Sequence, residues 1–240
     1  MSKHSDFILS PITKILNDMV AAHSGIGVGI ETFPLSEYSM QTTFLKMTGF
    51  QEQKMKCICW ELATDNFEYR YHRFRASPLG ECSTYREKQA VYKDLIEAIL
   101  GLDDTYDISV AINRTEIKND TKSYLDEIFL SSNLESWTNE NYNDFLKAWS
   151  NIRSNHIAVS TSKLFENVLQ DKYDLVYRHR NRCAHNTFSY QDNLPTLITL
   201  VDDNHIYENY YLRFSLLILI DSVFRKLYKK YLEVSQVNFD

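Results

Sequence analysis

The chain has 240 residues, of which 44% are hydrophobic and 24% charged, so it can bury a sizeable core without disulfides or metals. Its formal net charge of -6 excludes a protein that coats nucleic acid through overall charge, so any basic function must be local. Only 6 glycines and 4 prolines occur, which favours long helices over the many tight turns of an all-β fold.

The cysteines and the most apolar run indicate the compartment. No signal peptide precedes the four cysteines, so we expect reduced thiols in the cytoplasm. Cys57 and Cys59 lie two residues apart, and no second Cys or His pair has zinc spacing, so no metal or other cofactor is expected. The most apolar run, 216–220, is far shorter than the roughly 20 residues of a membrane span, so no membrane partner is expected.

The first predicted element is a helix from Phe7 to Ala22. Ser10 can serve as its N-cap, and Pro11 then occupies the first helical position, where its missing N–H is not needed. Alternating glycines follow in residues 25–29, without the spacing of a phosphate-binding loop, so they predict a flexible connection. Residues 1–35 together form a predicted N-terminal extension.

A long helix is predicted from Ser36 to Asn66. Its apolar residues recur every three or four positions, which is the helical period. Glu52 and Gln53 are polar residues beside this apolar stripe. Each of them either reaches into the interior or faces water.

Aromatic and basic residues alternate in the next stretch, 67–75. Aromatic rings beside cations commonly hold single-stranded nucleic acid, so Arg70 and Arg73 are candidate RNA contacts. The alternative is cation–π packing on a protein surface, without a nucleic-acid ligand.

The middle of the chain has the weakest pattern. A helix is predicted over 85–100, and Gly101 is a stop signal for it. Residues 108–112 fit either a short strand or a helix. Two shorter helices flank the polar run 131–141, namely Thr121–Phe129 and Tyr142–Ile152. We interpret 102–157 as an insertion within a single domain that spans residues 1–240.

The last third has the clearest helical pattern. A helix is predicted from a cap at Ser160 or Thr161 to about Ala184. A polar loop, a short apolar piece and a final helix follow, predicted over 186–195, 196–201 and 208–234. The middle of the final helix is apolar almost all round, which is typical of a deeply buried helix or of one shared with a partner chain. The two helices form a predicted pair over 158–235.

Residues 177–186 contain three arginines, two histidines and two asparagines. The apolar stripe of the preceding helix, made by Phe165, Leu169, Tyr173 and Val176, continues onto Arg180. A buried guanidinium requires an anion, which is either a carboxylate such as Glu52 or a substrate phosphate. Arg178 and Arg182 share a different face, so they are candidate phosphate contacts on the solvent side.

His185 follows Arg180 by five residues, so the two side chains point about 140° apart on an ideal helix. Either the helix ends between them, or a second copy of the chain completes the pair. Asn181 lies four residues before His185 and can orient its imidazole. A histidine that moves a proton beside an arginine that stabilises phosphate charge suits RNA cleavage, in which the 2′-hydroxyl is the nucleophile.

The sequence Arg-Asn-Arg-Cys-Ala-His at 180–185 resembles the motif of the HEPN superfamily, an arginine followed by a histidine after four to six residues. The resemblance covers mainly 160–234. It implies an all-α fold, an up-and-down helical bundle that dimerises so that two motifs line one cleft. The N-terminal and middle helices are additions to this bundle.

Many members of this superfamily are metal-independent endoribonucleases of toxin–antitoxin and phage-defence systems. The resemblance therefore implies that Arg180, His185 and Asn181 are catalytic and that RNA is the substrate. It also implies that an acidic or amide residue of an earlier helix assists, for which Glu52 and Gln53 are candidates. A homodimer and an antitoxin or defence-system partner are expected. The alternative is a non-catalytic module that binds RNA, a nucleotide or another protein.

Overall fold

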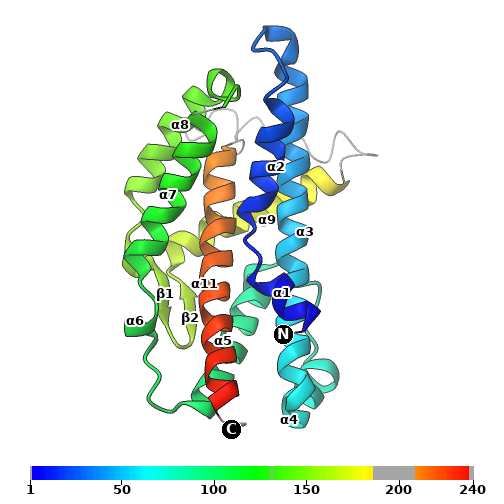
Figure 1. The fold of residues 1–240 in the computed structure, drawn as a ribbon, viewed down its shortest axis with the longest axis vertical. Helices are drawn as coiled ribbons and strands as arrows, with labels where there is room; N and C mark the ends of the chain where they lie inside the picture. Colours follow the sequence, from blue (N-terminus) through cyan, green and yellow to red (C-terminus); the bar gives the residue numbers. More distant parts are fainter. Residues whose placement is uncertain (1, 131, 186–208, 238–240) are drawn as a thin grey trace.

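The computed structural model describes residues 2–130, 132–185 and 209–237, and it is mostly α-helical (Figure 1). The helices of the first half are α1 (Lys3–Leu9), α2 (Thr13–His23), α3 (Phe33–Asp65), α4 (Phe67–Tyr71) and α5 (Tyr85–Leu102), with the 3-10 turn η1 (Ile30–Thr32) and the π-helical turn η2 (His72–Ala76). Those of the second half are α6 (Ile108–Ala111), α7 (Arg114–Leu130), α8 (Glu135–Ser150), the 3-10 turn η3 (Ser154–His156), α9 (Asn167–His185) and α11 (Tyr210–Val237). Strands β1 (Ile157–Ser160) and β2 (Lys163–Phe165) form an antiparallel hairpin.

The helix α11 lies at the centre of the fold. It contacts α1, α3, α5, α7, α8 and α9, and Figure 1 shows it between the α7–α8 side and the α2–α3 side. Every residue from 210 to 221 is buried, which confirms the deep burial that its apolar middle predicts. None of the described helices combines the length and the apolarity that a membrane span requires.

The long helix of the first half begins three residues before the predicted start at Ser36. Pro34 occupies its first turn, where a missing backbone N–H costs nothing. Asn66 ends this helix and caps the next one, because its side chain accepts a hydrogen bond from the Tyr69 backbone N–H over 2.8 Å. Residues 67–75 are therefore helical, with a π-helical end.

The prediction of one helix from Phe7 to Ala22 is wrong. Pro11 separates α1 from α2, and Ser10 is the C-terminal cap of α1 rather than an N-cap. Its hydroxyl donates to the Phe7 carbonyl over 2.7 Å. The prediction treats proline only as a helix starter, whereas here it is also where the preceding helix stops.

The prediction of a helix starting at Ser160 or Thr161 is also wrong. Residues 157–165 form the β1–β2 hairpin, in which Ile157 pairs with Phe165. β-branched residues in β1 favour a strand, and the predicted caps lie at its end and in its turn. Phe165 is buried, but it lies in β2 and not on the stripe of α9.

The middle of the chain is more helical than its pattern predicts. Residues 108–112 begin a short helix, α7 starts seven residues before Thr121, and α8 includes most of the polar run 131–141. The first turns of α7 carry one buried apolar residue, Ile117, so few apolar positions mark the start of that helix. Gly101 lies inside the last turn of α5 rather than after it. The predicted loop and apolar piece at 186–201 fall outside the described residues.

Candidate functional site

Arg180 lies on α9, on the face that also carries three buried side chains, those of Leu169, Tyr173 and Val176. Its side chain is 27% exposed, so it is half-buried rather than fully buried as the stripe predicts. Its Nη2 donates to Glu52 Oε2 over 3.3 Å, and its Nη1 donates to Asn181 Oδ1 over 3.2 Å. The guanidinium has five N–H donors, so these contacts leave an exposed part of it for an anion.

Glu52 is the acidic residue that α3 places against α9. Its side chain is only 10% exposed, and the contact with Arg180 compensates part of the cost of burying its charge. Gln53 is exposed, because the next residue of a helix points about 100° away. Of the two candidate assisting residues, the structure brings only Glu52 to Arg180.

A buried cation, Lys88, lies near this pair. Lys88, on α5, is 1% exposed, and its Nζ donates to the Cys82 carbonyl over 2.6 Å. Burial lowers the pKa of Lys88 to about 8, although the negative charge of Glu52 acts in the opposite direction. Lys88 is therefore mostly protonated at neutral pH. The negative charges of Glu52 and Glu87 both act on this ammonium, and the positive charge of Arg180 opposes them.

The loop before α5 fixes this lysine. Cys82 has φ 61°, in the left-handed region, where a residue with a Cβ costs about 1–2 kcal/mol. Its carbonyl receives the Lys88 ammonium, and the next carbonyl, that of Ser83, accepts a hydrogen bond from the Tyr173 hydroxyl over 3.0 Å. The ammonium also lies 5.3 Å from the centre of the Tyr173 ring. The strained loop thus joins α5 to the motif-bearing helix.

Sequence reasoning missed Lys88, Tyr173 and this loop as parts of the site. The signal for Lys88 was present, because the predicted apolar stripe of α5 contains Val91 and Leu95. Three residues before Val91, on the same face, is Lys88. A lysine on a buried stripe requires an anion or a hydrogen-bond acceptor, as Arg180 does. The role of Cys82 had no signal, because a positive φ at a cysteine is uncommon.

His179, the other histidine of the motif region, is buried and packs against the Phe44 ring at 5.1 Å between centroids. Its Nδ1 accepts a hydrogen bond from Arg182 Nη2 over 3.3 Å, and its Nε2 lies 3.4 Å from the Tyr210 hydroxyl. Burial, and then the charges of Arg213 and Arg182, lowers the pKa of His179 to about 2. This imidazole is neutral and structural, so it does not exchange protons at neutral pH.

The low pKa of His179 predicts a loss of stability in mild acid. The unfolded state gains a proton below its pKa of 6.5, whereas the folded state does not until about pH 2, so stability falls as pH drops through this window. At pH 5 the loss is about 2 kcal/mol, from 1.5 pH units. Urea unfolding at pH 7.5 and pH 5 should show a drop in the wild type that His179→Gln largely removes. Equal drops in both proteins would contradict this assignment.

His185 is the last residue of α9, and its side chain lies outside the described part of the structure. The helix is continuous from Arg180 to His185, so it does not end between them. On an ideal helix, two positions five residues apart point about 140° apart. Completion of the pair by a second copy stays a prediction.

The two remaining arginines of the motif region differ in their surroundings. Arg178 is exposed, as predicted. Arg182 is half-buried, and its guanidinium contacts His179 rather than extending into solvent. The prediction that both share one solvent-facing surface is therefore wrong for Arg182. The buried ring of His179 draws this side chain toward α11.

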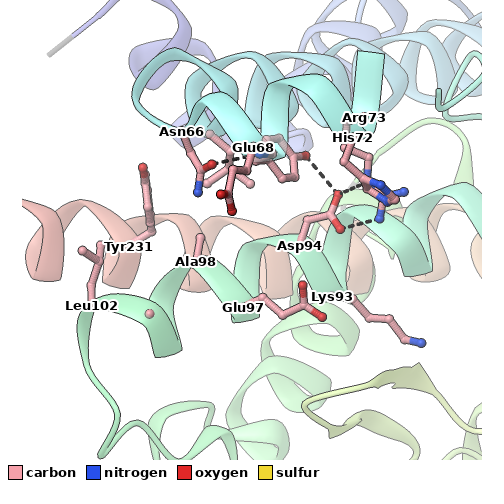
Figure 2. A pocket seen from close by; sticks show the side chains of 13 residues that line it. Asn66, Glu68, His72, Arg73, Lys93, Asp94, Glu97, Ala98, Leu102 and Tyr231 are labelled. Atoms are coloured by element: carbon pink, nitrogen blue, oxygen red, sulfur yellow. Dashed lines mark hydrogen bonds and ion pairs between the residues drawn. The ribbon is translucent and has the colours of Figure 1, made fainter. Parts of the chain in front are cut away.

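Arg70 and Arg73 lie far along the chain from the motif, on α4 and η2. Arg73 is not available to RNA, because it forms a two-pronged ion pair with Asp94 of α5, with Nε to Oδ2 at 2.6 Å and Nη2 to Oδ1 at 2.5 Å (Figure 2). The two side chains are 15% and 5% exposed. Arg70 is exposed, with its guanidinium carbon 5.3 Å from the centre of the Phe67 ring.

Known proteins do not identify the site. Among the described residues, no three His, Cys, Asp or Glu side chains are grouped as metal ligands would be. The resemblance of residues 180–185 to the HEPN motif therefore stays a prediction that rests on the motif and on the geometry around Arg180. The chain matched no protein-family model, no curated protein and no solved structure with which it was compared.

Proposed function

We propose that the protein is a metal-independent endoribonuclease of the HEPN type, with Arg180 and His185 as its catalytic residues. The observation that carries the proposal is the partly exposed guanidinium of Arg180, which the Glu52 carboxylate holds. The exposed part of the Arg180 guanidinium can bind a phosphate group of RNA beside the Glu52 carboxylate. The packing of α9 against both α3 and α11 supports a HEPN-like bundle.

The chemistry follows from the two motif residues. His185 accepts the proton of a ribose 2′-hydroxyl, and the 2′-oxygen forms a bond to the adjacent phosphorus. The bond from phosphorus to the 5′-oxygen breaks, the leaving oxygen takes up a proton from water, and His185 releases its proton to solvent. Arg180 stabilises the negative charge that builds on the phosphate oxygens, while Glu52 keeps its guanidinium in place. The products are a 2′,3′-cyclic phosphate and a 5′-hydroxyl.

A second copy of the chain completes the site in this proposal. On an ideal helix, positions 180 and 185 point about 140° apart, which motivates a catalytic pair shared between two chains. In a homodimer, Arg180 of one chain and His185 of the other share a cleft. The activity suits a toxin or a phage-defence effector, which is restrained by an antitoxin or another defence-system protein.

The products of the reaction test the proposal directly. RNA incubated with the purified protein in excess chelator should give fragments with 2′,3′-cyclic phosphate ends, which mass spectrometry detects. A substrate with 2′-deoxyribose at the cleaved nucleotide should stay intact, because it lacks the nucleophile. Cleavage of this substrate, or fragments with 3′-hydroxyl ends, would show attack by water instead and would refute the proposed mechanism.

The ion pair between Arg180 and Glu52 also favours a second function, a non-catalytic module that binds RNA or a nucleotide. In that case Glu52 satisfies Arg180 in the free protein, and a phosphate displaces or joins it on binding. Tight binding of RNA without any product over long incubation would identify this function. Residual cleavage that disappears with His185→Ala would exclude it.

A further inference from the structure

Three large aromatic side chains lie exposed on the outer side of α4 and η2. Phe67 is 70% exposed, and Tyr71 and Phe74 are each 52% exposed. They are spaced by four and then three residues, so they follow one side of the helical segment. We call this set the aromatic stripe. Clustered exposed rings are a feature of binding surfaces rather than of an ordinary solvated face.

Arginines lie beside these rings. The Arg70 guanidinium carbon is 5.3 Å from the centre of the Phe67 ring, and that of Arg75 is 5.9 Å from the centre of the Tyr71 ring. Both arginines are exposed, and no ion pair with a carboxylate is found for either of them among the described residues. The outer surface therefore combines flat apolar faces with positive charge, in a chain whose overall charge is negative.

The inner side of α4 and η2 is anchored, which keeps the aromatic stripe outward. Asp94 accepts hydrogen bonds from the Tyr69 hydroxyl over 2.9 Å and from Arg73, as Figure 2 shows. These residues line a cavity of about 650 Å³ between α4, α5 and α11. Because Tyr69 and Arg73 are fixed to α5, the segment cannot rotate to bury Phe67 and Tyr71. Its π-helical end adds a geometry that is common at functional sites.

We propose that the aromatic stripe, with Arg70 and Arg75, binds single-stranded RNA. Unpaired bases stack on the three rings, and the backbone phosphates contact the two guanidinium groups. A duplex cannot bind in this way, because its bases already stack on each other. An apolar protein surface fits less well, since it would strip water from two arginines without offering them an anion.

This inference deepens the proposed function, because it names the substrate as single-stranded RNA and places a second contact for it. Glu52 on α3 and Asn66, the residue that caps the end of α3, are about 20 Å apart along the helix, at 1.5 Å per residue. A strand must therefore be several nucleotides long to reach from Arg180 to the aromatic stripe. The inference rests on the proposed function only for the claim that the bound RNA is also the substrate.

Fluorescence anisotropy of a labelled single-stranded RNA of about 15 nucleotides tests the proposal, with Arg180→Ala present in every protein to prevent cleavage. Replacing Phe67, Tyr71 and Phe74 together by alanine should weaken binding at least about 100-fold, since each stacked base contributes about fivefold or more. Tyr38→Ala is the matched control, because Tyr38 is 65% exposed at the other end of α3 and should leave the affinity unchanged.

The arginines give a second readout. Arg70→Ala with Arg75→Ala should reduce the slope of log affinity against log salt concentration by about 1.4, or 0.7 for each lost phosphate contact. An RNA duplex of the same sequence should bind equally well to the Arg180→Ala protein and to the variant that also lacks the three aromatic rings.

Single-strand affinity that stays within twofold of the parent in the triple variant would overturn the proposal. So would an equal loss for the duplex, which would indicate a folding defect of the variant rather than the loss of base stacking. Neither result depends on cleavage, and cleavage of a dinucleotide, which is too short to reach the aromatic stripe, tests the proposed function separately.

Discussion

Arg180→Ala and His185→Ala are each expected to lower the rate of RNA cleavage by about 100-fold or more. Arg180 is the group that stabilises charge on the phosphate, and His185 is the group that moves the proton. When the two are supplied by different chains, a heterodimer of the two variants keeps one complete pair. Co-expression with two different tags, followed by purification through both, isolates this heterodimer. It should recover about half of the wild-type activity, since one of two sites is intact.

The reciprocal heterodimer is the control. It joins a wild-type chain to a chain that carries both substitutions, so it has the same set of residues in a different arrangement. With pairs shared between chains, this protein should be inactive, because each site lacks one member. If instead each chain held its own pair, the result would reverse, and this control would keep half of the activity. Circular dichroism melting curves verify that the two single variants and the two heterodimers are folded.

The effect of Arg180→Ala on cleavage and on melting temperature decides between two roles of Glu52. A catalytic Arg180 needs a partner that positions the guanidinium without neutralising it, and a contact of 3.3 Å on a side chain that is 27% exposed meets that need. A structural Arg180 would need the same carboxylate for a different reason, to lower the cost of burial. Loss of cleavage with little change in melting temperature identifies the first role, and the opposite pattern identifies the second.

The long helices could be predicted from the sequence because their apolar faces repeat over many turns. The stripe of α3 and the apolar middle of α11 are of this kind, and both lie where the pattern places them. The contact of Arg180 with Glu52 was foreseen as one of two alternatives, since both lie on or beside a buried stripe. The pattern could not decide between the Glu52 carboxylate and a substrate phosphate as the partner of Arg180. Helical periodicity indicates which face of a helix is buried, but not which groups cover that face.

The parts that could not be predicted depend on contacts between distant residues. Residues 67–75 read as alternating aromatics and bases, yet they are helical because Asn66 caps them and Asp94, more than 20 residues later, holds Arg73. The β1–β2 hairpin is short, and its apolar residues also fit the start of a helix. Local sequence was ambiguous at both places, and tertiary contacts decided the structure.

The break between α1 and α2 has the same origin, and it leads to the prediction with the largest expected effect on stability. At Pro11 the Ser10 carbonyl and the Ile12 N–H bond to side chains instead of to a helix backbone. The Lys54 ammonium donates to the Ser10 carbonyl, and Asp221 Oδ2 accepts the Ile12 backbone N–H over 3.1 Å. Lys54 and Asp221 also pair with each other, with Nζ 2.6 Å from Oδ1. Their side chains are 1% and 3% exposed.

This buried pair therefore joins α3 and α11 to the junction of the first two helices. Burial lowers the pKa of Lys54 and raises the pKa of Asp221, while the attraction between their charges opposes both shifts. Removing one member leaves the other charge buried without its partner. Asp221→Leu is expected to lower the free energy of unfolding by about 3–5 kcal/mol, a large part of the 5–15 kcal/mol of a typical domain.

Urea denaturation of four proteins checks this expectation: the wild type, Asp221→Leu, Lys54→Met, and the two substitutions combined. Each single variant should lose several kcal/mol, because each leaves an uncompensated charge. The double variant should be more stable than either single variant, since no charge is then buried and two apolar side chains fill the space. Losses that simply add would mean that the two residues act independently, and the pair would then not be what joins the N-terminal helices to α11.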